Sequence, residues 1–318
     1  MSNPALPPPP SPSGPASDVK WLIDASRVGN SIRVLRPGVA MWLLGAGALV
    51  VILPFEPTTK MTLGMVLCGV FIGVMAYFWS IVRSLRAEES QLDLIEDALA
   101  LKRYPEVAGR LQGLMASPMR ADQHRLRAMV LLATFLARNG RYDDALVVYN
   151  ELTGTERVAG PSGAMVKIGR AMAMLQSDHL YDADRAITDL RRLIDRGGAE
   201  DELQQIDSAA PAMPADALAI SALRLVELYR DVKTGHAEEA IASFEKNLPL
   251  LTAGLGHRVG EAHALVAVAY DRLNRPDDAR QRFLDGTALQ GIADILNRYP
   301  EVRPLIAKYA PTPAPGVG

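Results

Sequence analysis

Two long apolar runs without a charged residue constrain the fold of this chain more than any other feature of its sequence. Residues 37–55 and 61–82, which are 19 and 22 residues long, contain no Asp, Glu, Lys or Arg. As α-helices they would extend about 28 and 33 Å, close to the roughly 30 Å hydrocarbon core of a bilayer. A buried helix of a soluble domain usually keeps a polar face, and neither run has one. The sequence therefore predicts two transmembrane helices.

The charges that flank the two runs predict their orientation. The connector 56–60 has five residues, which suits a tight antiparallel hairpin over 37–82. Its one basic residue is offset by Glu56, whereas the outer flanks of the hairpin carry Lys20, Arg27, Arg33, Arg36, Arg83 and Arg86. Because loops rich in Lys and Arg stay in the cytoplasm, we expect a multi-pass protein of the cytoplasmic (inner) membrane with both termini cytoplasmic.

Small residues recur at helical spacing along the second run, at Gly69, Gly73 and Ala76. Such a face lets two transmembrane helices approach closely, so it predicts helix packing inside the membrane. The packing partner is either the first helix of the same hairpin or the same face of a second copy. Neither run contains a charged residue, which argues against transport of ions or solutes.

The segments next to the hairpin have different compositions. Residues 1–16 hold seven of the 22 prolines and predict a disordered, polyproline-II-prone tail, and 310–318 predicts a second disordered tail. Within 17–36, apolar residues recur at helical spacing among basic ones, at Leu22, Ala25, Val28, Ile32 and Leu35. This pattern predicts either an amphipathic helix at the membrane surface or a loose basic linker.

The remaining part, 84–309, contains degenerate copies of one pattern. Segments 138–152, 233–248 and 272–286 each have a polar turn, an acidic pair, an alanine and an aromatic residue four positions later. These anchors are Ala145 and Tyr149, Ala240 and Phe244, and Ala279 and Phe283. Fainter copies have Ala186 with Leu190, and Ala108. No run alternates as a strand would, so the fold class is predicted to be all-α, and each copy joins a helix A to a helix B.

This pattern resembles the tetratricopeptide repeat (TPR) family, in which Gly140 and Gly235 would occupy the turn-glycine position. In layout the chain is similar to HemY-like bacterial membrane proteins, which also place a transmembrane hairpin before such repeats. The resemblance implies a TPR-like α-solenoid of four to five repeats after the hairpin. We expect an exposed loop over 197–215 and capping helices near 288–297 and 302–309.

The resemblance also implies a protein partner bound on the concave side of the A helices. The residues that the family pattern places there are Arg127, Thr134, Arg138, Glu261, Asp271 and Arg272. The alternative is that these polar side chains are simply solvated.

Residues that could support catalysis do not form a pattern. The single cysteine, Cys68, excludes an internal disulfide and a cysteine-based zinc site. The five histidines lack ligand spacing, and the glycines of 254–260 join two predicted helices without the strand that a phosphate loop needs. Acidic pairs at 143–144, 238–239 and 277–278 are expected at helix N-termini, where they complement the helix dipole. We expect no enzyme activity, cofactor or metal.

The predicted function is a membrane-anchored helical-repeat scaffold that mediates protein–protein interaction at the cytoplasmic face of the membrane. The alternative is a self-associating structural or assembly subunit, which would be a homo-oligomer. Residues 84–318 carry 28 basic and 33 acidic residues, which disfavours a nucleic-acid partner. The Ala-, Arg- and Gly-rich composition favours a bacterial membrane.

Overall fold

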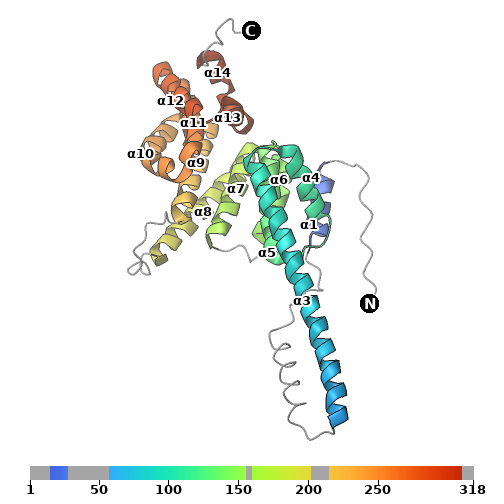
Figure 1. The fold of residues 1–318 in the computed structure, drawn as a ribbon. Coiled ribbons are helices and arrows are strands. Elements are labelled where there is room, and N and C mark those ends of the chain that lie inside the picture. Colours follow the sequence, from blue (N-terminus) through green and yellow to red (C-terminus); the bar gives the residue numbers. More distant parts are fainter. Residues whose placement is uncertain (1–14, 28–56, 155–159, 202–214, 310–318) are drawn as a thin grey trace. The chain divides into compact units, whose positions relative to one another are not determined.

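The computed structural model of this chain describes residues 15–27, 57–154, 160–201 and 215–309. Every regular element within these ranges is a helix, which confirms the predicted all-α class (Figure 1). The chain divides into two compact units, Met1–Leu131 and Leu132–Gly318, and the boundary falls inside one helix, α5.

Unit 1 is built from α3 and α4, with α1 and the first part of α5 packed around them. The helices are α1 (Pro15–Ala25), α3 (Pro57–Ala100), α4 (Tyr104–Met115) and α5 (Asp122–Arg138). Their apolar faces form a small core, whose most completely buried side chains are Leu92, Ile95, Val107, Leu111, Met115 and Met129.

The predicted second transmembrane helix, 61–82, is part of α3, which continues without interruption to Ala100. No Pro or Gly lies between residues 74 and 100, so nothing in the sequence ends the helix at the charged residues that follow the apolar run. The predicted first helix, 37–55, lies outside the described residues. Among the described parts of the chain, no helix combines the length and the apolar character needed to cross a membrane.

Only the first part of the segment 17–36, residues 17–27, lies within the described residues. Its helix, α1, ends at Ala25, and Val19 and Ile23 are buried against protein, including α4. The backbone continues this packing, since Ser26 accepts a hydrogen bond from the Met119 amide. Val19 and Ile23 of α1 are therefore covered by unit 1, and residues 17–25 are helical. Residues 28–36 lie outside the described residues, so the position of the segment at a membrane surface stays a prediction.

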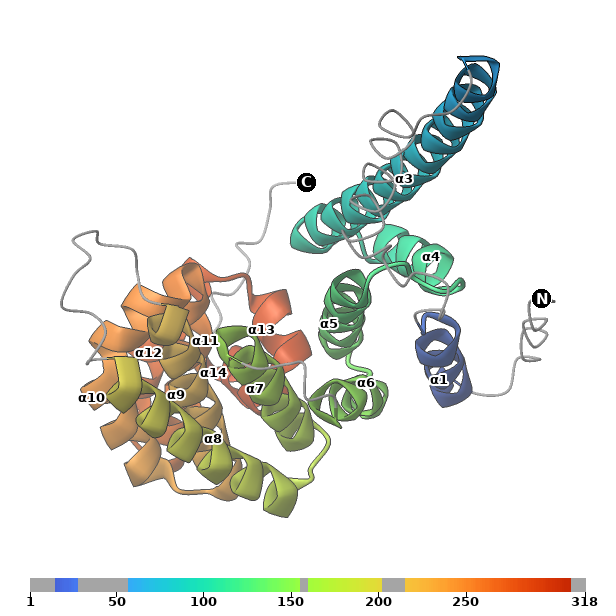
Figure 2. The same cartoon turned by 90° about the horizontal axis from the view of Figure 1, so that it is seen from below.

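Unit 2 contains the second part of α5 and the remaining helices (Figure 2). These are α6 (Tyr142–Gly154), α7 (Gly160–Gln176), α8 (Leu180–Asp201), α9 (Ala215–Thr234), α10 (Ala237–Leu255), η2 (Gly256–Arg258), α11 (Val259–Arg272), α12 (Pro276–Leu289), α13 (Ile292–Arg298), η3 (Pro300–Val302) and α14 (Arg303–Tyr309). The central helix is α11, which is buried on every side from Val259 to Tyr270.

Five turns between an A helix and a B helix have the same backbone geometry. Each has one residue at positive φ, between 54° and 86°: Lys102, Gly140, Asp178, Gly235 and Asn274. In each, the next amide donates a hydrogen bond to the carbonyl five residues before it, as from Arg141 to Leu136. This is the Schellman arrangement, which ends helix A and satisfies its last carbonyls. The two predicted turn glycines are confirmed as left-handed residues, and three non-glycine residues adopt the same conformation.

The turns fix the position of each helix B in the pattern and correct the anchors predicted for two of the copies. Counting five and nine residues from the turn gives Ala145 and Tyr149 in the α5–α6 pair, as predicted. The same count gives Ala183 and Ile187 in α8, where Ala186 and Leu190 were expected, and Val107 and Leu111 in α4, where Ala108 was expected. Ala183 and Val107 are fully buried, whereas Ala186 and Ala108 are partly exposed.

A pair of substitutions tests this register. Ala183→Leu is expected to lower the free energy of unfolding by about 1–3 kcal/mol, because the added atoms have no space in a filled core. Ala186→Leu is expected to change it by less than about 0.5 kcal/mol, since Ala186 borders an open pocket. Chemical denaturation followed by far-UV circular dichroism measures both. The reverse order of effects would restore the register read from the sequence.

Other local expectations fare differently. The three acidic pairs lie in the first turns of α6, α10 and α12, as predicted. The glycines of 254–260 lie at the junction of α10, η2 and α11, which confirms that they connect two helices. The predicted loop over 197–215 is wrong at its start because α8 continues to Asp201, and residues 202–214 lie outside the described residues.

Candidate functional site

Four of the six predicted partner-contacting residues are bound to neighbouring helices of their own unit. In unit 1, Arg127 forms ion pairs with Asp93 and Glu96 of α3. In unit 2, Thr134 hydrogen bonds to Tyr149 of α6. The Arg272 guanidinium donates to the Val232 carbonyl, and the Arg138 carbonyl accepts from the Asn297 side-chain amide. Their role in binding another protein stays a prediction.

The two predicted acidic residues on α11 bind the C-terminal part of the same chain. Asp271 accepts hydrogen bonds from Lys308 Nζ at 2.6 Å and from the Tyr309 hydroxyl at 2.9 Å. Glu261 has no exposed surface, and its carboxylate accepts the Tyr299 hydroxyl at 2.7 Å and pairs with Arg298. A partner could therefore reach Glu261 only after this C-terminal part had moved away.

The environment of Glu261 keeps its carboxylate charged. Burial alone would raise the pKa of Glu261. The positive charges of Arg298 and Arg258, together with hydrogen bonds from Arg258 and Tyr299, outweigh that effect and lower the pKa to about 2. Glu261 is thus a fully buried, ionised carboxylate that Arg258, Arg298 and Tyr299 stabilise.

The low pKa of Glu261 predicts an acid-sensitive contribution to stability. The carboxylate stabilises the fold fully above its usual pKa of 4.5, and this contribution is lost as the pH falls towards about 2. The shift corresponds to about 3 kcal/mol, of which about 2 kcal/mol should be lost by about pH 3. The measurement is the difference in free energy of unfolding between the wild type and Glu261→Gln at several pH values. A difference that does not depend on pH would show that the carboxylate is not charged in the fold.

A short segment, residues 297–301, lies against the ends of several A helices, and we call it the strap. Two of its backbone carbonyls are held by side chains of other helices. The Tyr142 hydroxyl donates to the Asn297 carbonyl at 3.1 Å, and Gln176 Nε2 donates to the Arg298 carbonyl at 3.1 Å. In return, Asn297 Nδ2 donates to the Arg138 carbonyl at 2.7 Å. These contacts fix the course of the strap backbone across the C-terminal ends of α5 and α7.

The side chains of the strap bind α9 and α11. The Tyr299 ring packs edge-on against Tyr229, with ring centroids 5.0 Å apart, while its hydroxyl reaches Glu261. Glu301 accepts the Tyr229 hydroxyl at 3.2 Å and lies 3.6 Å from Lys233 Nζ. We call the surface that holds the strap the A-helix face; its residues are Arg138, Tyr142, Gln176, Tyr229, Lys233 and Glu261.

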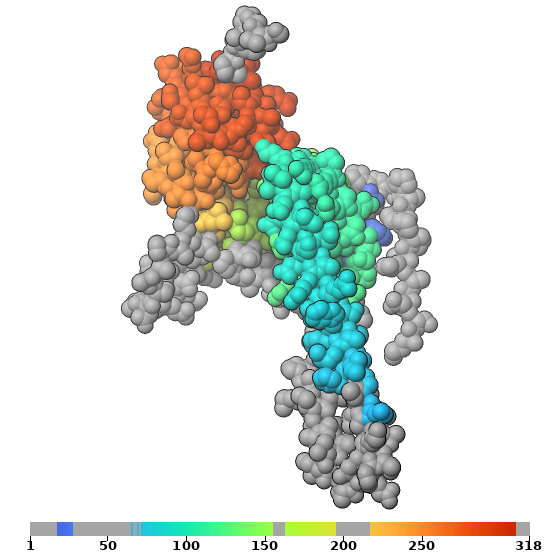
Figure 3. Space-filling model, in the orientation of Figure 1, coloured from blue at the N-terminus to red at the C-terminus, as the bar shows by residue number. Residues whose placement is uncertain are grey.

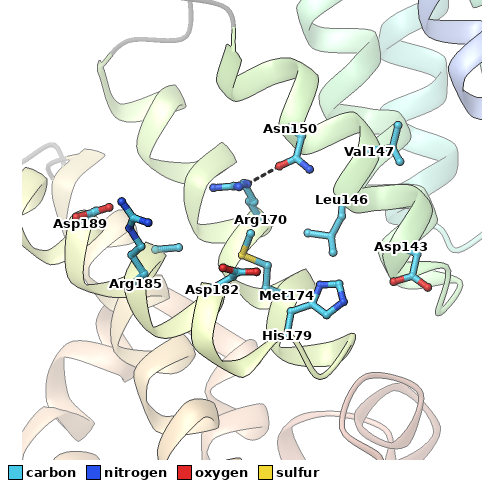
Figure 4. Close-up of a pocket in the computed structure, with 11 residues that line it drawn as sticks. Asp143, Leu146, Val147, Asn150, Arg170, Met174, His179, Asp182, Arg185 and Asp189 are labelled. Carbon is cyan, nitrogen blue, oxygen red and sulfur yellow. Dashed lines mark hydrogen bonds between the residues drawn. The ribbon is translucent and has the colours of Figure 1, made fainter.

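Two of the hollows on the described surface belong to unit 2. One, of about 510 Å³, borders the strap and is lined by Tyr142, Gln176, Tyr229, Leu296, Asn297 and Arg303, among others. The other, of about 610 Å³, lies between α6, α7 and α8. Figure 4 shows Arg170 reaching Asn150 across its floor, 2.7 Å away, and the charged side chains Asp182, Arg185 and Asp189 along α8. The hollow between α6, α7 and α8 is lined by side chains of both charges, which suits a polypeptide ligand better than a small apolar molecule. The hollow beside the strap has Arg303 as the one charged residue of its lining.

The predicted packing residues of the membrane helix have no neighbour in the described chain. A Cβ atom added at Gly69 or Gly73 would meet nothing within 4 Å, and Ala76 is exposed. Their role in helix packing stays a prediction. Among the described residues, no group of three or more His, Cys, Asp or Glu side chains could hold a metal ion.

The sequence reasoning missed the strap and most of the A-helix face. One signal was present in the sequence, because the pentapeptide Arg-Tyr-Pro-Glu-Val occurs twice, at 103–107 and at 298–302. The first copy begins helix α4, and the second spans the junction of α13 with η3. Comparison of the chain with protein-family models, curated proteins and solved structures found no match.

Proposed function

We propose that this chain is a membrane-anchored helical-repeat scaffold. Its two apolar runs insert into the cytoplasmic membrane as a hairpin, and its helix pairs form a TPR-like solenoid in the cytoplasm that binds another protein. The observation that carries the proposal is α3, in which a stretch of uncovered apolar side chains leads directly into the first helix pair.

The exposed side chains of α3 support the anchor. Large apolar residues at positions 71–79 are at least two-fifths exposed, namely Phe71, Ile72, Met75, Tyr77, Phe78 and Trp79, the last at 70%. On the face seen in Figure 3, no other described segment of unit 1 covers this part of α3. Apolar patches of this kind mark surfaces that meet a membrane or another protein. The absence of charge along 61–82 favours the membrane.

The contact between α1 and α4 supports the hairpin topology. Helix α1 precedes both apolar runs and α4 follows both, yet the two helices pack together within unit 1. A chain that crossed a bilayer once between them would separate them, whereas two crossings return it to the same side. This argument does not depend on charge, and it agrees with the distribution of basic residues around the runs.

Reporter fusions test the topology. Fusions at both ends of the chain should be active on the cytoplasmic side, and a fusion in the connector 56–60 on the opposite side. Repeats that a protease can digest on intact cells would contradict the proposed orientation.

Crosslinking in native membranes, followed by identification of what is captured, tests the scaffold function. The matched control is the hairpin alone, residues 1–83, which shares the membrane part but lacks the helix pairs. No partner above this control would contradict the scaffold proposal. The size of the chain in detergent then tests self-association as the alternative, which a strict monomer excludes.

A further inference from the structure

The strap makes contacts that a terminal cap does not need. A cap covers the last helix pair of an array, because only that pair has an open apolar end. The strap instead contacts the ends of α5 and α7, whose residues Arg138 and Gln176 are 159 and 122 positions away along the chain. Together with α9 and α11, it contacts four successive A helices within five residues. A segment that touches four helix pairs in this way lies across the array and not only at its end.

The chemistry of these contacts is also that of peptide recognition. Side chains of the A-helix face bind strap backbone carbonyls, which fixes a chain direction without regard to sequence. Other groups of the face bind the side chains of the strap. The Glu261 carboxylate binds Arg298 and Tyr299. The Tyr229 hydroxyl and the Lys233 amine bind Glu301. Charge-assisted hydrogen bonds of this kind are stronger than those between neutral groups and add geometric specificity.

Space and connection allow the strap to be exchanged. The hollow of about 510 Å³ shows that the strap does not fill the face on which it lies. The junction with α12 is not helical, since Gln290 is extended and Gly291 is exposed. Ile295, Val302 and Leu305 are buried on the segments that flank or carry the strap. The strap is therefore part of a short folded segment, and polar groups of the A-helix face bind its central residues.

We propose that the A-helix face is a peptide-binding site and that the strap is its occupant from the same chain. Its external ligand is a segment of a partner protein with the same order of groups, namely Arg, Tyr and, two positions after the Tyr, an acidic residue. This inference rests on the proposed scaffold function, because it names where on the scaffold the partner binds. The strap competes with that partner at the high effective concentration of a tethered ligand.

The experiment uses the full chain in detergent with a protease site inserted between Gln290 and Gly291. The probe is a fluorescent synthetic peptide of residues 291–309, and its anisotropy reports binding. The uncut protein should bind it weakly, and the cut protein should bind it with at least tenfold higher affinity. A peptide of residues 98–109, which carries the other Arg-Tyr-Pro-Glu-Val copy, should compete more weakly, because it has Lys102 where the strap has Asn297.

Substitutions in the peptide avoid any effect on protein folding. Arg298→Ala should weaken binding at least tenfold, because Glu261 loses its charged partner. Arg303→Ala is the matched control, since Arg303 is exposed, and it should change affinity less than threefold. Equal effects of the two substitutions would overturn the proposal. So would unfolding of the cut protein on loss of residues 291–318, because the strap would then be an integral cap.

The outcome is separable from that of the scaffold proposal. A partner captured equally by the uncut protein and by the protein freed of its strap would leave the scaffold function in place and overturn the assigned site. Peptide binding as described, with no partner captured from native membranes, would leave the site in place and contradict the scaffold function.

Discussion

Replacing Glu261 by alanine is expected to lower the free energy of unfolding of unit 2 by about 3–5 kcal/mol. The substitution leaves Arg298, which is mostly buried, without its carboxylate partner, and the buried Tyr299 hydroxyl without its acceptor. The Tyr299 hydroxyl has no contact with water in the fold, and the Arg298 side chain keeps only 25% of its exposure. Solvent therefore offsets little of the loss of their partner. Chemical denaturation followed by circular dichroism measures the change.

The matched control is Asp278→Ala at the start of α12. Asp278 also pairs with an arginine, Arg275, at 2.8 Å, but both side chains are about half exposed. Exposed pairs of this kind contribute about 0–1 kcal/mol. If Glu261→Ala cost no more than Asp278→Ala, the buried position of Glu261 would be wrong, and the pH dependence described above would fail with it.

Phe283→Ala is expected to have an effect of similar size, about 3–5 kcal/mol. Phe283 is fully buried at the ninth position after the Asn274 turn, where it fills the core of the last helix pair beside Tyr309. The truncation removes a ring and leaves a cavity that the backbone of the central helix α11 cannot close. Its neighbour Leu284, which is 37% exposed, provides the control, and Leu284→Ala should cost less than about 1 kcal/mol. A cost below about 1.5 kcal/mol for Phe283→Ala would show that this register position is not a core anchor.

The helices and three of the five turns could be predicted from the sequence because local chemistry determines them. Gly140 and Gly235 adopt the left-handed conformation readily, and an alanine with an aromatic residue four positions later marks helix B. The wrong anchors predicted in α4 and α8 have a physical cause. Lys102 and Asp178 adopt the same left-handed conformation, which residues other than glycine rarely do. These two turns therefore contain no glycine that would mark them in the sequence. Where a turn has no glycine, the sequence pattern points to Ala186 and Ala108 and not to the buried Ala183 and Val107.

The site could be predicted only in part. Glu261 and Asp271 lie on α11, the helix A to which the resemblance to the repeat family assigned them by counting from Ala279, because that count covers a short stretch of chain. That the chain's own Arg298, Tyr299 and Lys308 bind them depends on contacts between residues 37 or 38 positions apart. The contacts of Asn297 with Arg138 and Tyr142 span more than 150 positions. No periodicity within a helix encodes such pairings.

The packing of α1 on α4 also determines the order in which the chain can be completed. Val19 and Ile23 lie before both apolar runs, and the surface of unit 1 that covers them is made only after both. On the proposed topology, the N-terminal segment must therefore wait in the cytoplasm until the hairpin has been synthesised and inserted. A fragment that begins at residue 84 lacks this segment, so it should aggregate, and adding residues 15–27 as a separate peptide should restore its solubility. The segment synthesised before the two apolar runs is thus needed to complete the fold of the segment synthesised after them.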